Sequence, residues 1–134
     1  MTPDGHERIG IRLTWLGHAT VLVELPGLTF MTDPFFGDRL GPLRRHGPIP
    51  DPGLLPDADL VLISHAHPDH FDPASIRSLG GSPRFVVPVG MAPAVSRVVP
   101  AGRVDGMQVG DVRAVVRQAP TARSEEHTSE LQSR

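Results

Sequence analysis

The chain has 134 residues, a formal net charge of −2 and no cysteine. Its length suits one domain or part of one, and its charge gives no reason to expect binding to nucleic acid or to an anionic membrane. Without cysteine, disulfides and thiolate ligands are excluded, so any metal ion must be held by His and carboxylate side chains. No apolar run approaches the roughly 18 residues of a membrane span, and the polar N-terminus lacks a signal-peptide pattern. We therefore expect a cytoplasmic protein.

The first third of the chain predicts an antiparallel meander. Residues 9–16 alternate between apolar and polar types, which is typical of a strand, and we expect Trp15 in the core rather than at a substrate surface. After a break at Gly17-His18, the β-branched and apolar residues 20–25 predict a second strand. A Pro26-Gly27 turn signal then leads to a third strand at 28–32.

Residues 33–59 are rich in proline and glycine and predict a long irregular loop. Such a loop in a compact domain is usually functional or mobile, so we expect residues 35–56 to border the site on the substrate side. Arg44, Arg45 and His46 could meet an anionic substrate there, although a solvated loop face is the favoured interpretation.

The second half of the chain alternates between strand and helix patterns. The apolar run 60–63 predicts a strand buried on both faces. Asp72 can cap a helix that starts at Pro73 and ends before Gly80-Gly81. The further predicted elements are a strand at 85–87, a helix at 91–99 and a strand at 112–116. This order favours an α/β protein with its sheet inside and its helices outside.

Four potential metal ligands follow the predicted strand 60–63 within six residues: His65, His67, Asp69 and His70. Alternate side chains of an extended segment share a face, so His65 and His67 can point the same way, and Asp69 and His70 can approach from another side. Imidazole and carboxylate groups suit zinc, iron or manganese. An exposed polar loop is the alternative, but this spacing favours a metal site at the carboxyl end of a strand.

The pattern H-x-H-x-D-H resembles the signature of the metallo-β-lactamase superfamily. The resemblance covers about residues 11–122 and includes three motifs in order, WLGHAT at 15–20, TDP at 32–34 and SHAHPDH at 64–70. That order is similar to the branch of ascorbate-6-phosphate lactonase-like and N-acyl-phosphatidylethanolamine phospholipase D-like proteins. The resemblance implies the N-terminal half of a four-layer αββα fold.

The resemblance also implies roles for individual residues. His65 and His67 match ligands of one metal ion, whereas Asp69 and His70 match ligands of a second, with Asp69 also catalytic by holding a metal-bound hydroxide. The expected cofactor is two divalent ions, zinc first, with manganese or iron as alternatives. Asp33 matches a carboxylate that supports the ligands, although a turn-forming Asp before proline is the alternative. His18 could face the same crevice or be an ordinary packed or exposed histidine.

The implied reaction is hydrolysis of a lactone, a phosphodiester or a related bond in a small-molecule or lipid-like substrate. The superfamily site also needs a third His, a bridging Asp and a last His, and this chain lacks matching residues. Residues 123–134 resemble a translated sequencing adapter, so we predict a truncated domain at 1–122 and a non-native tail at 123–134. The alternatives are a non-catalytic metal-binding module and an inert fragment. The sequence does not indicate an oligomeric state.

Overall fold

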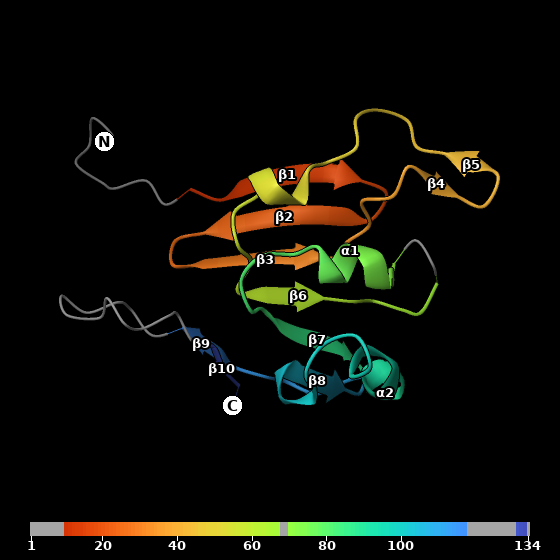
Figure 1. The fold of residues 1–134 in the computed structure, drawn as a ribbon. Helices are drawn as coiled ribbons and strands as arrows, with labels where there is room; N and C mark the ends of the chain where they lie inside the picture. The colour runs from red at the N-terminus through yellow and green to blue at the C-terminus, as the bar shows by residue number, and fades with distance from the viewer. Residues whose placement is uncertain (1–9, 68–69, 118–130, 134) are drawn as a thin grey trace, which may run out of the picture.

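A six-stranded sheet forms the centre of the computed structural model, which describes residues 10–67, 70–117 and 131–133 (Figure 1). In sheet order the strands are β1 (Arg12–Gly17), β2 (Thr20–Leu25), β3 (Leu28–Thr32), β6 (Leu60–Leu62), β7 (Arg84–Pro88) and β8 (Val104–Met107). The first three form an antiparallel meander, and β6, β7 and β8 run parallel to β3. The predicted α/β class is confirmed.

The meander matches its prediction closely because turn residues mark both of its corners. Strands β2 and β3 have the predicted bounds, and Gly27 between them has a φ of +79°, a conformation that glycine adopts without strain. Strand β1 begins at Arg12 rather than at residue 9, since its pairing with β2 starts where Arg12 lies opposite Glu24.

The helices are shorter than predicted. The helix α1 (Pro73–Arg77) starts after Asp72, but this carboxylate accepts a hydrogen bond from the Ser75 hydroxyl at 2.5 Å and none from a backbone amide. The helix α2 (Ala92–Val95) replaces a predicted helix over 91–99, because the residues before it form a 3₁₀ turn and those after it form turns that stop at a proline. Three short 3₁₀ helices complete the set: η1 (Pro52–Leu54), η2 (Val89–Met91) and η3 (Ala101–Arg103). None of the described helices is long and apolar enough to cross a membrane.

Two small sheets lie outside the central one. Strands β4 (Arg39–Leu40) and β5 (Leu43–Arg44) form a hairpin inside the long loop. Strand β9 (Val115–Arg117) overlaps the predicted strand 112–116 and pairs with β10 (Leu131–Ser133) rather than with the central sheet. The proposed domain boundary at 122 lies outside the described residues and stays a prediction.

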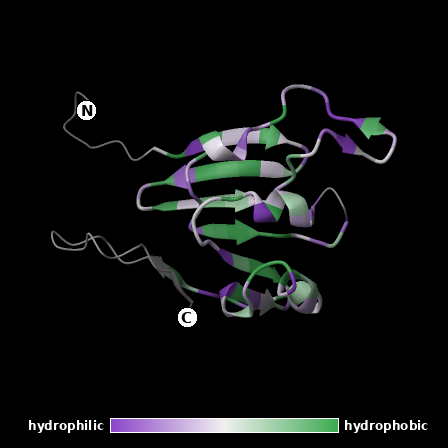
Figure 2. Ribbon diagram, viewed as in Figure 1, coloured by the Kyte–Doolittle hydropathy of each residue, from purple (hydrophilic) through white to green (hydrophobic). Residues whose placement is uncertain are grey.

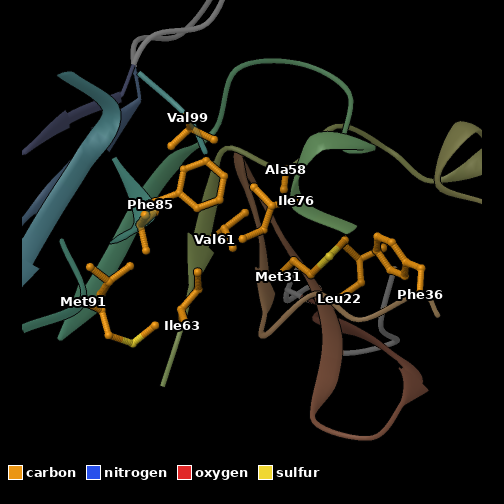
Figure 3. Packing of buried hydrophobic residues seen from close by; sticks show 12 residues of the cluster. Leu22, Met31, Phe36, Ala58, Val61, Ile63, Ile76, Phe85, Met91 and Val99 are labelled. Carbon is orange, nitrogen blue, oxygen red and sulfur yellow. The ribbon is translucent and has the colours of Figure 1, made fainter. Parts of the chain in front are cut away.

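The core lies on one face of the central sheet. A row of directly opposed residues runs across four strands, from Leu22 through Met31 and Val61 to Phe85, and each is at most 2% exposed. Figure 3 shows Ile76 of α1 directed at this row, and α2 adds the fully buried Val95. Each fully buried aliphatic side chain of this kind contributes about 1.5–3 kcal/mol of hydrophobic stabilisation.

The opposite face of the sheet is apolar but open among the described residues. Leu13 and Trp15 of β1 are 68% and 73% exposed, and Leu62 and Val86 are half-buried. Figure 2 shows the strongly apolar strands β2 and β6 that contribute to both faces. The expected core position of Trp15 is therefore wrong. In the run 60–63, Leu60 and Val61 point to opposite faces and both are buried, as is Ile63, so the predicted burial on both faces fails only at the half-buried Leu62.

Candidate functional site

Three strands, β1, β3 and β6, end at the same edge of the sheet. Strand β1 runs parallel to β3 because two antiparallel pairings separate them, and β6 is parallel to β3. Their carboxyl ends therefore lie on the same edge, where His18 follows β1, Asp33 follows β3 and residues 63–65 follow β6 (Figure 1). Ligand sites of open parallel sheets form outside such strand ends.

Asp33 is held in an unusual backbone conformation directly after β3. Its φ of +37° lies in the left-handed region, which Asp tolerates better than most residues. The Asp33 amide donates to the carbonyl of Leu62 at 2.8 Å. The fully buried Thr20 hydroxyl donates to the Asp33 carbonyl at 2.7 Å and accepts from the Phe35 amide at 3.1 Å. These contacts fix the direction of the Asp33 side chain.

The Asp33 carboxylate contacts both the start and the end of the histidine segment, residues 64–70. Its Oδ1 accepts a hydrogen bond from the Ser64 amide at 2.7 Å. Its Oδ2 accepts from the Ser64 hydroxyl at 2.7 Å and contacts Nδ1 of His70 at 2.9 Å. The residue Asp33 is 5% exposed, so these charge-assisted hydrogen bonds are shielded from water.

This network determines which ring nitrogens carry protons. The Ser64 hydroxyl has one hydrogen, which it donates to Asp33, so at its 2.9 Å contact with Nδ1 of His65 it accepts. The carboxylate is an acceptor alone, so Nδ1 of His70 also donates. Protonation at Nδ1 puts the lone pair of each imidazole on Nε2. A neutral imidazole with that tautomer is suited to bind a metal ion through Nε2.

The three histidine rings lie together at this edge. The ring centroids of His65 and His70 are 3.8 Å apart, and those of His65 and His67 are 4.6 Å apart. Asp69 lies outside the described residues. Within residues 10–67 and 70–117, no three His, Asp or Glu side chains form an arrangement that could hold a metal ion. The chemistry of the donors fits a divalent ion, and a complete ligand set stays a prediction.

His18 packs on a residue outside the histidine cluster. It is exposed, with a φ of +52°, and its ring meets that of Phe35 edge-on at a centroid distance of 5.0 Å. Its carbonyl accepts a hydrogen bond from Nε1 of Trp15 at 2.9 Å. No signal in the sequence pointed to Phe35, and Thr20 was present only as the last residue of the WLGHAT motif. Ser64 was visible inside the SHAHPDH motif, where its place next to His65 is the signal that could have identified it.

The loop residues considered for the substrate side divide into two kinds. Arg44 and His46 are exposed. Arg45 is 8% exposed, and its guanidinium donates to backbone carbonyls of Leu16, of Phe35 at 3.1 Å and of Pro48 at 3.3 Å. Arg45 therefore links the end of β1 to the start and the middle of the loop, with its donors directed at the protein.

Comparisons with known proteins show the family to which the chain belongs. A family model described as "Beta-lactamase superfamily domain" matches residues 12–129. The chain is 40% identical over 97 residues to N-acyl-phosphatidylethanolamine-hydrolyzing phospholipase D 1 of Caenorhabditis elegans, covering 66% of this chain and 27% of that protein. It is 39% identical over 64 residues to a metal-dependent hydrolase of Methanopyrus kandleri, covering 48% of this chain and 25% of that one.

A solved structure shares the fold. The metallo hydrolase from the archaeon Ignicoccus hospitalis superposes with a TM-score of 0.55 at 21% identity, over 92% of this chain and 54% of that chain. The chain thus spans about a quarter of the two curated relatives and about half of the solved hydrolase. The described sheet is the N-terminal half of this fold, and the chain belongs to the β-lactamase superfamily domain family.

Proposed function

We propose that this chain is the first part of a metal-dependent hydrolase whose site lies at the carboxyl edge of the sheet. One observation carries the proposal. Asp33 and Ser64 hold His65 and His70 in the tautomer that presents Nε2, and His67 lies beside them. A carboxylate that fixes the tautomer of neighbouring imidazoles is a recurrent feature of metal sites.

The proposed ligands are His65 and His67 for one ion and Asp69 and His70 for another. Zinc is the expected metal, with manganese or iron as alternatives, because nitrogen and oxygen donors suit all three. Bound ions would supply Lewis-acid polarisation of the scissile group and activation of water. Asp33 keeps the imidazoles in place, and Asp69 is the proposed catalytic residue, which orients the attacking water.

The proposed substrates are small or lipid-like molecules with a lactone, phosphodiester or related bond. The C. elegans relative is named for hydrolysis of N-acyl-phosphatidylethanolamine, and the M. kandleri relative is named as a metal-dependent hydrolase, which together support hydrolysis as the common reaction. We propose Arg44 and His46, which are exposed on the loop that follows β3, as contacts for an anionic substrate.

We further propose that the 134-residue chain has little activity alone. Two observations support this: the chain spans about a quarter of its curated relatives, and one apolar face of its sheet is open among the described residues. The four proposed ligands give two protein contacts per ion, whereas a catalytic zinc usually has three and a water. Such half-sites should bind metal weakly.

The test compares the 134-residue chain with the full-length product of its gene. Both are loaded with zinc or manganese, analysed for bound metal and assayed on lactone and phosphodiester substrates. Turnover and two bound ions in the longer protein alone are expected. In that protein, His67→Ala should abolish turnover and lower metal content while circular dichroism stays unchanged, and His46→Ala should retain bound metal as the control. Full turnover by His67→Ala would refute the proposal, and metal binding without turnover would favour a non-catalytic module.

A further inference from the structure

The Ser64 hydroxyl lies between the Asp33 carboxylate and the first histidine of the cluster. It donates to Oδ2 of Asp33 at 2.7 Å and accepts from Nδ1 of His65 at 2.9 Å. The Ser64 amide donates to the other carboxylate oxygen, Oδ1, at 2.7 Å. Because one carboxylate holds both the backbone and the side chain of Ser64, the hydroxyl lone pair that meets His65 has a fixed direction.

The ring of His70 takes its orientation from a different partner. Its Nδ1 contacts Oδ2 of Asp33 at 2.9 Å, whereas the Ser64 hydroxyl oxygen is 3.4 Å away. The shorter contact lies inside the usual range for N–H···O hydrogen bonds, about 2.7–3.2 Å, and the longer one lies outside it. A charged acceptor also makes the bond roughly twice as strong as a neutral one. Asp33 therefore orients His70 directly, whereas it reaches His65 through Ser64.

His67 has no support of this kind in the described part of the chain. The described residues give its ring nitrogens no hydrogen bond, and its exposed ring meets that of His65 edge-on at a centroid distance of 4.6 Å. Of the two ligands proposed for one ion, only His65 is thus held by a hydrogen bond, and Ser64 supplies it. The two proposed metal positions therefore depend on different supporting side chains.

We infer that Ser64 is the positioning residue of His65 alone, and that it thereby governs one of the two metal positions. The metal part of this inference rests on the proposed hydrolase function, but the tautomer of His65 requires neither metal nor turnover. The hydrogen bond at one ring nitrogen sets which nitrogen carries the proton. Without the Ser64 hydroxyl, Nδ1 of His65 loses its acceptor, and the proton moves to Nε2, the nitrogen proposed to bind the metal.

The first test measures tautomers in the metal-free 134-residue chain by ¹⁵N NMR in mildly alkaline buffer, because protonated and unprotonated ring nitrogens have well-separated shifts. His65→Gln and His70→Gln assign the two rings. In the parent chain both rings should carry the proton on Nδ1. Ser64→Ala should move the His65 proton to Nε2 in a large share of the molecules and leave His70 unchanged. Ser64→Thr keeps the hydroxyl at an exposed position and should restore the parent tautomer of His65.

Ser78→Ala is the matched control, because it also removes a bonded hydroxyl, one that donates to the Ser75 carbonyl, and it should change neither ring. Circular dichroism checks that each variant folds. Ser64→Val has the shape of Ser64→Thr without the hydroxyl and replaces Ser64→Ala if the latter does not fold. An unchanged His65 tautomer without the hydroxyl, equal changes in His65 and His70, or failure of Ser64→Thr to restore His65 would overturn the inference.

The second test counts metal ions in the full-length product of the gene. Ser64→Ala should weaken the binding of one zinc ion about 10–100-fold and leave the other unchanged, as measured by zinc titration with metal analysis. Equal weakening of both ions would overturn the selective role of Ser64. If the parent protein binds no zinc, the proposed function fails, and the tautomers of the metal-free chain still decide whether Ser64 positions His65.

Discussion

Gly17 ends β1 and Asp33 directly follows β3; both have a positive φ, and both lie against side chains from distant parts of the chain. The φ of Gly17 is +101°, and the Arg45 guanidinium occupies the space where a Cβ would lie. The φ of Asp33 is +37°, and its carboxylate turns toward Ser64 and His70. Backbone conformations that most residues avoid therefore position both the loop and the histidine cluster.

Gly17→Ala should destabilise the protein by at least about 2 kcal/mol, because it combines an unfavourable φ with an overlap against Arg45. Gly27→Ala is the matched control, since Gly27 has a φ of +79° but open space at its Cβ position, and it should cost about 1 kcal/mol. Urea unfolding followed by circular dichroism measures both. Equal losses in the free energy of unfolding would show that the Arg45 side chain moves aside without an energetic cost.

Thr20→Val should cost about 2–3 kcal/mol although it preserves side-chain shape. It removes the hydroxyl that serves the Asp33 carbonyl and the Phe35 amide in a fully buried position, so both groups lose a partner. Thr20→Ser keeps the hydroxyl and should cost less. Denaturant midpoints give the comparison, and a Thr20→Val protein as stable as the parent would show that these backbone groups find other partners.

At the scale of the elements, the sequence predicted strands best where turn residues bound them. Strands β2 and β3 have the predicted ends because Gly17-His18 and Pro26-Gly27 mark the corners. Strand β8 was missed because its residues, Val-Asp-Gly-Met, lack an apolar run and pair with β7 through tertiary context. The alternation in β1 correctly predicted a strand, but it could not tell which face is covered, and Trp15 was placed on the wrong side.

The two faces of β7 should respond differently to the same substitution. Val87 is 2% exposed in the core, whereas its neighbour Val86 points to the open face and is half-buried. Val87→Ala should lower the free energy of unfolding by about 2 kcal/mol, and Val86→Ala by less than about 1 kcal/mol. Thermal or urea unfolding of the pair tests this directly. Equal losses would indicate that the Val86 face is packed in solution.

At the scale of the whole molecule, the family and the N-terminal half of the fold could be predicted, because the motifs WLGHAT, TDP and SHAHPDH occur in order. The complete site could not, because ligand placement depends on tertiary contacts, and Asp69 lies outside the described residues. The supporting contacts of Asp33 depend on the pairing of β3 with β6, which no local pattern encodes.

The open sheet face should make the 134-residue chain prone to self-association, since exposed apolar patches and edge strands both promote it. Leu13 is 68% exposed on the edge strand β1, so Leu13→Lys should reduce light scattering at high protein concentration. Leu54→Lys replaces an 83% exposed leucine on η1 and should have a smaller effect. Equal improvement by both would mean that added charge alone, rather than this face, controls solubility.

The connection between β3 and β6 also orders the events of folding. The meander closes through two-residue turns, whereas β6 must return to β3 across the whole of residues 33–59 and pair in parallel. Short turns close quickly, and a long loop pays its closure entropy before its contacts repay it. We therefore expect the meander to form first with Asp33 at its end, and the histidines to reach that carboxylate when β6 pairs with β3. A metal ion encountered before this step meets separate imidazoles rather than an assembled cluster.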